Sequence, residues 1–297
     1  MKPPSFKYFD PASIDAALEL LHEHQEDAKL LAGGQSLVPL LNFRMARPQV
    51  VIDLNRIEAL SYLREEEGWL AVGAMTRQRM IEDSNLVRKG CGILTDTMEL
   101  IGHPQIRNRG TVGGSLVHAD PAAELTAIAR LLDARMTVKN RNGERLVAAE
   151  DFFVGVFTTS IEPSEMLTEV RFPRLGPKTG WAFEEFAVRH GDFAVAGVAA
   201  LVTLDEGGVC EEGRLAAIAA GETAFRDSKL ESMLKGEKLT DALVDEVAHR
   251  LASSVDPFDD LHASAAQRRH LTGVLAKRAL KKAAHAAAAR NRLGEKT

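Results

Sequence analysis

Cysteine is scarce in this sequence of 297 residues: only Cys91 and Cys210 are present, and they lie far apart. An iron–sulfur cluster normally requires four cysteine ligands, and a structural zinc site requires four cysteine or histidine ligands at characteristic spacings. Neither set can be assembled here from a local motif. We therefore predict that both cysteines are reduced, buried residues that behave as small hydrophobes, and that the chain holds no metal of its own.

Long apolar runs are also missing. No segment approaches the roughly 20 residues that cross a bilayer, and the start Met1-Lys2-Pro3-Pro4 does not have the pattern of a signal peptide. The net charge of −5 argues against a nucleic-acid-binding protein. We expect a soluble, cytoplasmic protein. Its length suits two domains, and its apolar content of 45% is enough for a large core.

Two common phosphate-binding motifs are absent as well: no G-x-G-x-x-G follows a first strand, and no lysine follows the glycines as in a P-loop. Two other glycine-rich segments are present instead. The first loop (residues 30–37) contains Ala32-Gly33-Gly34-Gln35-Ser36, and the second loop (residues 110–116) reads Gly110-Thr111-Val112-Gly113-Gly114-Ser115-Leu116. In turns of this kind, successive backbone N–H groups form a concavity that binds anions. Two such loops in one chain predict a site for a ligand with two phosphates, which points to a dinucleotide.

The segments around these loops predict regular structure. Residues 29–32 are typical of a short buried strand, and Ser36 is a plausible N-cap for a helix that begins with Leu37. Residues 121–134 predict a helix with Pro121 in its first turn and Glu124 near its positive end.

The rest of the chain alternates strand and helix patterns. Further strands are expected at residues 50–54, 69–73, 136–138, 145–147, 167–172, 181–188, 195–204 and 216–220, with a hairpin turn at Asn142-Gly143. Further helices are expected at residues 13–24, 76–85, 92–101, 241–253 and 263–289. The segment 173–178 has linker composition. We therefore divide the chain into residues 1–176, with subdomains of about 1–55 and 56–176, then residues 177–290 and a tail of residues 291–297.

Three motifs carry a family resemblance. Residues 32–39 resemble the first FAD loop of the flavoprotein (medium) subunits of molybdenum hydroxylases, the xanthine dehydrogenase and carbon monoxide dehydrogenase medium-subunit family. Residues 102–115 resemble the second FAD loop of that family, and residues 118–124 continue the match. Gly191-Asp192-Phe193-Ala194 resembles a weaker signature in the C-terminal part. The likeness spans nearly the whole chain.

This resemblance implies an α+β fold. An FAD-binding domain of the PCMH or vanillyl-alcohol-oxidase type, in two subdomains, would come first. A C-terminal domain of the carbon monoxide dehydrogenase flavoprotein type, with a three-stranded sheet and a helix bundle, would follow.

The resemblance also implies which residues bind FAD. The first loop would wrap the diphosphate through its N–H groups, and Ser36 and Thr111 would add hydroxyl donors. Glu124 would accept from ribose hydroxyls, and Phe193 would approach the flavin from the C-terminal part. The full implied set is Lys29, Leu30, Leu31, Ala32, Gly33, Gly34, Gln35, Ser36, Leu37, Ile101, Thr111, Gly113, Gly114, Ser115, Asp120, Glu124, Leu167 and Phe193. Of these, Ile101 and Leu167 would pack near the flavin rings. No residue is expected to act on an organic substrate as acid, base or nucleophile.

Some positions depart from the family pattern or stay open. Carbon monoxide dehydrogenases tend to carry histidine at Gln35 and asparagine at Ser115, and eukaryotic xanthine dehydrogenases tend to carry lysine at Glu184, so the substrate and the electron acceptor are left open. Arg107 and Arg109 could pair with FAD phosphates or with a carboxylate on a partner subunit.

The implied function is that of an electron-transfer subunit. A molybdopterin-containing large subunit would oxidise the substrate, and a small subunit with two [2Fe-2S] clusters would relay electrons to FAD on this chain and on to an external acceptor. A heterohexamer with two copies of each of the three chains is expected. Two alternatives are a stand-alone flavin-dependent oxidase or dehydrogenase of the same fold, and a non-catalytic nucleotide-binding or assembly module.

Overall fold

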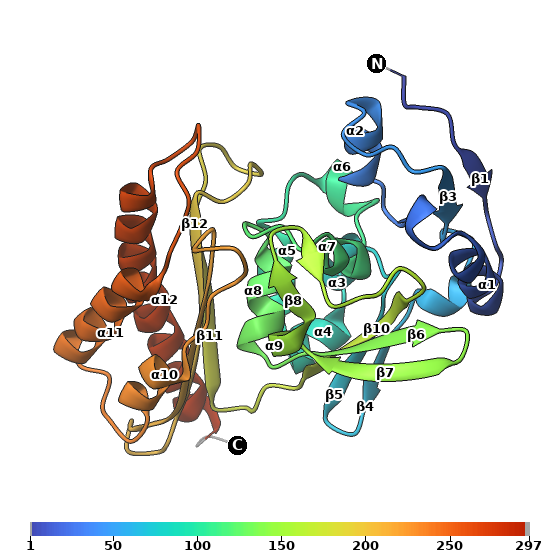
Figure 1. Cartoon of the computed structure of the whole chain (residues 1–297). Coiled ribbons are helices and arrows are strands. Elements are labelled where there is room, and N and C mark those ends of the chain that lie inside the picture. Colours follow the sequence, from blue (N-terminus) through green and yellow to red (C-terminus); the bar gives the residue numbers. More distant parts are fainter. Residues whose placement is uncertain (1, 295–297) are drawn as a thin grey trace.

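A computed structural model describes residues 2–294 of the chain (Figure 1). Residues 2–173 build two main sheets with helices beside them, and the following residues build a third sheet that is backed by helices. No helix among the described residues is both long enough and apolar enough to span a membrane.

The first sheet is parallel and has the strand order β1-β3-β2. It consists of β1 (Lys7–Phe9), β3 (Val50–Asp53) and β2 (Ala28–Leu31). Helix α1 (Ile14–His24) lies against it, because Ala17, Leu18 and Leu21 recur at helical spacing and share one core with Val50 and Ile52. Since Leu31 pairs with Asp53, β2 and β3 end at the same edge of the sheet.

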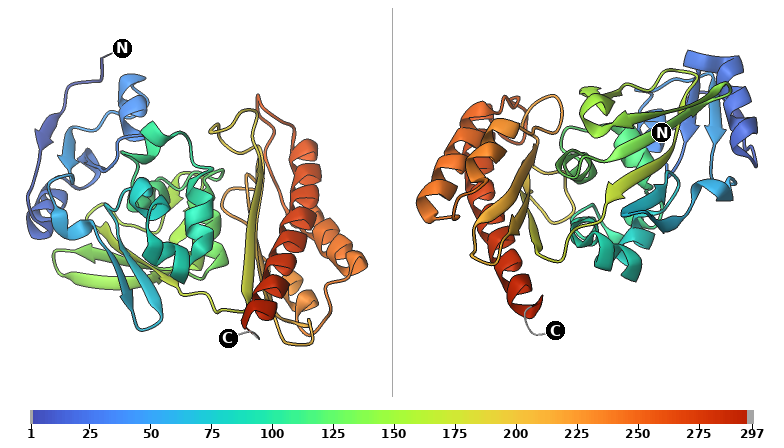
Figure 2. Two further views of the ribbon diagram at one scale, coloured as in Figure 1. Left: turned by 180° about the vertical axis from the view of Figure 1, so that it is seen from behind. Right: turned by 90° about the horizontal axis from the view of Figure 1, so that it is seen from below.

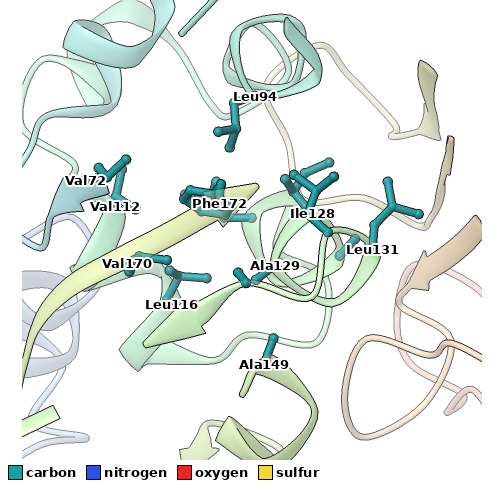
Figure 3. Packing of buried hydrophobic residues seen from close by; sticks show 14 of the residues in the cluster. Val72, Leu94, Val112, Leu116, Ile128, Ala129, Leu131, Ala149, Val170 and Phe172 are labelled. Carbon is teal, nitrogen blue, oxygen red and sulfur yellow. The ribbon is translucent and has the colours of Figure 1, made fainter. Parts of the chain in front are cut away.

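The second sheet has the order β4-β5-β10-β6-β7, and its strands pair antiparallel. Its strands are β4 (Leu63–Glu66), β5 (Trp69–Gly73), β6 (Arg135–Asn140), β7 (Gly143–Ala148) and β10 (Met166–Pro173). Figure 3 shows the core beside it, where Phe172 of β10 gathers with Val72, Leu116 and Ile128. Phe172 is completely buried.

Short helices cover this core and connect the sheets. They are α2 (Leu37–Asn42), α3 (Gln78–Glu82), α4 (Asn85–Gly90), α5 (Gly92–Met98), α6 (Pro104–Arg107), α7 (Val112–His118), α8 (Glu124–Leu131) and α9 (Ala149–Phe152). The 3-10 turns η1 (Gln25–Asp27) and η2 (Glu58–Leu60) and the small pair β8 (Phe153–Gly155) and β9 (Thr158–Thr159) complete this part.

The third sheet is an antiparallel meander of β11 (Thr179–Phe186), β12 (Ala196–Leu204) and β13 (Cys210–Ile218). Helices α10 (Ser228–Leu234), α11 (Asp241–Ser254) and α12 (Ala265–Gly294) form one layer on its outer face (Figures 1 and 2). Val198 and Val202 pack toward these helices, whereas Ala199 and Leu201 join the core of the N-terminal part. Because β12 is buried on both faces, its sequence is a nearly continuous apolar run.

Several predicted boundaries were wrong. Helix α8 begins at Glu124 and not at Pro121, because Asp120 first closes a turn by accepting from Ala122 N. The helix expected at residues 76–85 is only α3, since a new helix starts after the capping residue Ser84. The β6–β7 turn is Arg141-Asn142, because Asn140 pairs with Gly143. Helices α4, α6, α7, α9 and α10 and strands β1, β4, β8 and β9 were not predicted. In the expected tail, residues 291–294 continue α12, and residues 295–297 lie outside the described residues.

Two arginines from the C-terminal part hold the end of α8. Arg226 Nη1 donates to Arg130 O at 2.7 Å and to Asp133 Oδ1 at 2.5 Å, and its Nε bonds Glu231 at 2.6 Å. Arg214 Nη1 donates to Leu131 O at 3.1 Å and to Asp133 Oδ2 at 2.7 Å. Cations at the C-terminal end of a helix satisfy its free carbonyls and complement its dipole. The two parts of the chain are therefore joined by polar contacts as well as by the shared core.

We predict that Arg226→Met lowers the free energy of unfolding by about 2 kcal/mol, because hydrogen bonds to a charged group are lost and Glu231 is left half-buried without its partner. Arg250→Met is the matched control: it breaks the exposed Arg250–Glu246 pair of α11, and such pairs contribute little. Denaturant unfolding of both variants measures the difference. Equal effects of the two substitutions would contradict this account of Arg226.

Candidate functional site

The two glycine-rich loops lie against each other. A Cβ atom added to Gly33 would come within 2.4 Å of Arg109 O and 2.8 Å of Gly110 Cα, so only a residue without a side chain fits there. Ala32 Cβ lies 3.4 Å from the place that a Cβ of Gly114 would take. The fold thus brings together two segments that are some 80 residues apart in the sequence.

The first loop leaves its N–H groups free. Within residues 2–294, none of the backbone N–H groups from Gly33 through Leu37 donates a hydrogen bond. Gly34 has a φ of +75°, which turns the chain at the centre of this run. The β2 strand ends directly before it, so the run starts from a fixed position. Consecutive free N–H groups around a left-handed residue form an anion-binding concavity.

The second loop behaves differently, and the prediction of free N–H groups there was wrong. Gly110 N donates to Ile106 O at 2.7 Å, Val112 N to Thr76 O at 3.0 Å and Gly113 N to Ala74 O at 2.8 Å. Gly114 N and Ser115 N donate to the Oγ1 and O atoms of Thr111. The second loop therefore uses these N–H groups to fix its own position beside the first loop.

The hydroxyl groups of Ser36 and Thr111 also differ in use. Thr111 has an extended backbone and caps α7, where its Oγ1 accepts from Gly114 N at 3.0 Å. Ser36 precedes α2 but has a helical backbone conformation (φ −104°, ψ −48°), and its hydroxyl makes no capping bond. The hydroxyl of Ser36 is thus left beside the free N–H groups.

A cavity of about 390 Å³ opens over the first loop. Its lining residues are Leu31, Ala32, Gly33, Gly34, Gln35, Val38, Pro39 and Arg109. Arg109 is exposed, whereas Arg107 is buried and pairs with Glu82 through both Nε (2.8 Å) and Nη2 (3.0 Å). Arg107 is therefore held within the fold, and Arg109 supplies a cation at the cavity. Within the predicted set, Lys29 is exposed on β2, and Leu30 packs into the core of the first sheet.

Glu124 is buried at the first position of α8, with only 8% of its surface exposed. Burial raises its pKa to about 8, and the nearby carboxylates of Glu185 and Asp120 add to the shift. Burial likewise raises the pKa of Glu185, on β11, to about 7. Glu185 was not predicted as a site residue, because a charged residue in a strand pattern is usually exposed. The two carboxyl groups come from different parts of the chain and lie close enough for Glu185 to raise the pKa of Glu124.

The remaining predicted residues lie in other surroundings. Leu167 is buried in β10 and Ile101 is half-buried against the same core, while Phe193 is 70% exposed in the segment before β12. Both cysteines are buried and unpaired, as predicted, and burial raises the pKa of Cys91 to about 12 and that of Cys210 to about 11. Within residues 2–294, no group of three or more His, Cys, Asp or Glu side chains is arranged to hold a metal ion.

Comparisons with known families agree in both parts of the chain. Residues 4–175 match the family described as "FAD binding domain in molybdopterin dehydrogenase". Residues 181–283 match the family described as "CO dehydrogenase flavoprotein C-terminal domain".

Individual relatives match over nearly their whole length. The 6-hydroxypseudooxynicotine dehydrogenase complex subunit alpha of Paenarthrobacter nicotinovorans is 43% identical, with 97% of each chain covered. The caffeine dehydrogenase subunit beta of Pseudomonas sp. (strain CBB1) is 39% identical, with 96% of each covered. Among solved structures, carbon monoxide dehydrogenase from Hydrogenophaga pseudoflava superposes with a TM-score of 0.93 at 37% identity, covering 95% of this chain and 98% of that one.

The buried Glu124 generates a pH prediction. Below pH 4.5 its carboxyl is protonated in the folded and the unfolded chain alike. Between pH 4.5 and about 8 the unfolded chain loses this proton while the folded chain keeps it, so the free energy of unfolding falls as the pH rises. We predict that Glu124→Gln flattens this decline in the ligand-free protein and raises its thermal midpoint at pH 8 to 9. Thermal unfolding between pH 5 and 9 measures this, with the exposed Glu99→Gln as control; parallel curves for wild type and Glu124→Gln would refute it.

Proposed function

Because the chain belongs to the family of FAD-binding medium subunits of molybdenum hydroxylases, we propose that it is the electron-relay subunit of such a complex. It would receive electrons from [2Fe-2S] clusters on a small partner subunit and pass them through FAD to an external acceptor. A molybdopterin-containing large subunit would oxidise the substrate. An assembly with two copies of each of the three chains remains part of this proposal.

Family membership confirms the coarser predictions. The chain is an FAD-binding subunit of an oxidoreductase, and its cofactor is FAD. Its α+β fold combines the FAD-binding domain with the carbon monoxide dehydrogenase flavoprotein C-terminal domain, as predicted.

The observation that carries the site assignment is the run of free N–H groups from Gly33 through Leu37, because the first three residues of this run line the cavity. These groups fit the diphosphate of FAD, since an anion satisfies several of them at once. We propose that the hydroxyl of Ser36 adds a donor and that the Arg109 guanidinium supplies the compensating charge. When bound, FAD supplies the electron-transfer chemistry, and this chain supplies position and electrostatics.

Glu124 fits a role toward ribose hydroxyls, because a buried carboxyl group gains most from a donor that reaches it. We propose that Asp120 supports this end of α8 through its bond to Ala122 N. Ile101, Leu167 and Phe193 would lie nearer the flavin rings. Thr111, Gly113, Gly114 and Ser115 would act by holding the second loop against the first.

The substrate would be selected on another chain. Relatives that match this chain from end to end carry the names of enzymes for compounds as different as 6-hydroxypseudooxynicotine, caffeine and carbon monoxide. A fold that stays the same while the named substrate changes fits a subunit that handles electrons and leaves the organic substrate to a partner.

Comparing the purified chain with the native complex tests this proposal. We expect the FAD-loaded chain alone to pass electrons from chemically reduced FAD to artificial dyes but to oxidise no organic substrate, whereas the complex should contain iron and molybdenum and should reduce FAD when its substrate is added. Substrate turnover by the isolated chain would instead identify a stand-alone flavin enzyme. A chain that takes up no FAD would support a non-catalytic module.

We predict that Gly34→Val abolishes FAD retention while the fold stays intact. The new side chain would need a φ of +75°, and its Cβ would lie 3.1 Å from Val38 Cγ2, so the run of N–H groups would be displaced. Gly68→Val is the matched control, because Gly68 has a similar φ of +86° with no atom near its Cβ position. FAD content and circular dichroism of both variants measure the effect. Normal FAD content in Gly34→Val would rule out this part of the first loop as the diphosphate site.

A further inference from the structure

The two loops of the site belong to different sheets, so their alignment needs a link. The first loop follows β2 of the parallel sheet, and the second loop packs beside the end of β5 in the antiparallel sheet. Arg77 lies between them, in the segment that joins β5 to α3. Its main chain forms an isolated β-bridge with Thr111 of the second loop.

The Arg77 side chain donates hydrogen bonds to Arg109, beside the second loop, and to Asn55, near the first loop. Its Nη1 donates to Arg109 O at 2.5 Å, directly beside the second loop. Its Nη2 donates to Asn55 Oδ1, also at 2.5 Å. Arg109 O is the same atom that a Cβ on Gly33 would meet, so this bond fixes the surface on which the first loop rests.

Asn55 is hydrogen-bonded to the first loop. It lies just beyond β3, and because β2 and β3 end together, its side chain reaches Ala32. Asn55 Nδ2 donates to Ala32 O at 2.9 Å, and its backbone N donates to Asp53 Oδ1 at 2.9 Å. A chain of hydrogen bonds therefore runs from Arg109 O through Arg77 and Asn55 to the residue that precedes the free N–H groups.

The geometry of these hydrogen bonds favours arginine over lysine at position 77. Both acceptors of the Arg77 guanidinium are neutral oxygens, and they are reached by two different nitrogens of its planar fork. A lysine has the charge but a single nitrogen on an unforked stem. Burial lowers the pKa of Arg77, and the neighbouring Arg109 adds to this effect. The carboxylate of Asp53 opposes this shift, so Arg77 is held between a cation and an anion.

We infer that Arg77, acting through Asn55, is a positioning residue that aligns the two loops for the diphosphate of FAD. This inference rests on the proposed diphosphate site. Arg77 lies outside both glycine motifs, and in this inference it sets the distance between the two loops.

Arg77→Lys, Arg77→Met and Asn55→Ala in the full chain test the inference. After removal of FAD, its dissociation constant and the thermal midpoint of the FAD-free protein are measured for each variant. We expect all three to weaken FAD binding about tenfold or more, as for the loss of hydrogen bonds to a charged group. The double variant Asn55→Ala/Arg77→Met should bind no more weakly than the weaker single variant, because both break one chain of bonds. Arg56→Met, which breaks only an exposed pair with Asp10, is the control and should bind as wild type.

The outcomes separate the possible failures. Wild-type affinity in Arg77→Lys would overturn the inference, because charge alone would then suffice. A lower thermal midpoint with unchanged FAD affinity in all three variants would also overturn it, since Arg77 would then serve stability only. Absence of FAD binding by the wild-type chain would instead overturn the proposed function. Should Arg77→Met fail to fold, Arg77→Lys and Asn55→Ala still decide the question.

Discussion

The site depends on one contact between main chains. Gly33 rests on Arg109 O and Gly110 Cα at a distance that leaves no room for even a methyl group. A larger residue would push the first loop away from the second and would break the alignment that Arg77 and Asn55 maintain. Because most N–H groups of the second loop already donate hydrogen bonds within the fold, this loop acts as a support. The first loop, held on that support, keeps its N–H groups free.

Helix α8 connects this N-terminal part to the C-terminal part of the chain. Its first residue, Glu124, is buried near Glu185 of β11, while its last carbonyls accept from Arg214 and Arg226. One short helix is thus fixed at both ends by residues from two parts of the chain. The double-sided burial of β12 gives this junction an apolar core as well. The site therefore sits on a frame in which neither part can shift freely against the other.

The sequence predicted the longer strands and the long helices, because β12 is a nearly continuous apolar run and α1 has apolar residues at helical spacing with its cap at Ser13. It missed short elements such as β1, β4 and α10, whose few residues carry too weak a pattern. It also located both glycine loops. It could not show that they differ, because Gly-Gly followed by a hydroxyl looks alike in each. The difference comes from neighbours distant in the chain: Ala74 and Thr76 accept from the second loop, and nothing comparable reaches the first. Arg77 and Glu185 were missed for the same reason, since only the fold makes their charges half-buried.

The buried carboxyl group of Glu124, at the N-terminus of α8, shows how a residue kept for binding can lower the stability of the fold. A carboxylate would normally be favourable at a helix N-terminus, yet burial raises the pKa of Glu124 to about 8, so desolvation outweighs the helix dipole there. Packing alone would be better served by an apolar residue at this position. A carboxyl group kept at such a cost is explained by a partner that donates hydrogen bonds to it, and perturbed carboxyl groups of this kind gather at functional sites. The ribose hydroxyls of FAD are donors of that kind, and under the role proposed for Glu124 cofactor binding would offset the cost of burying it.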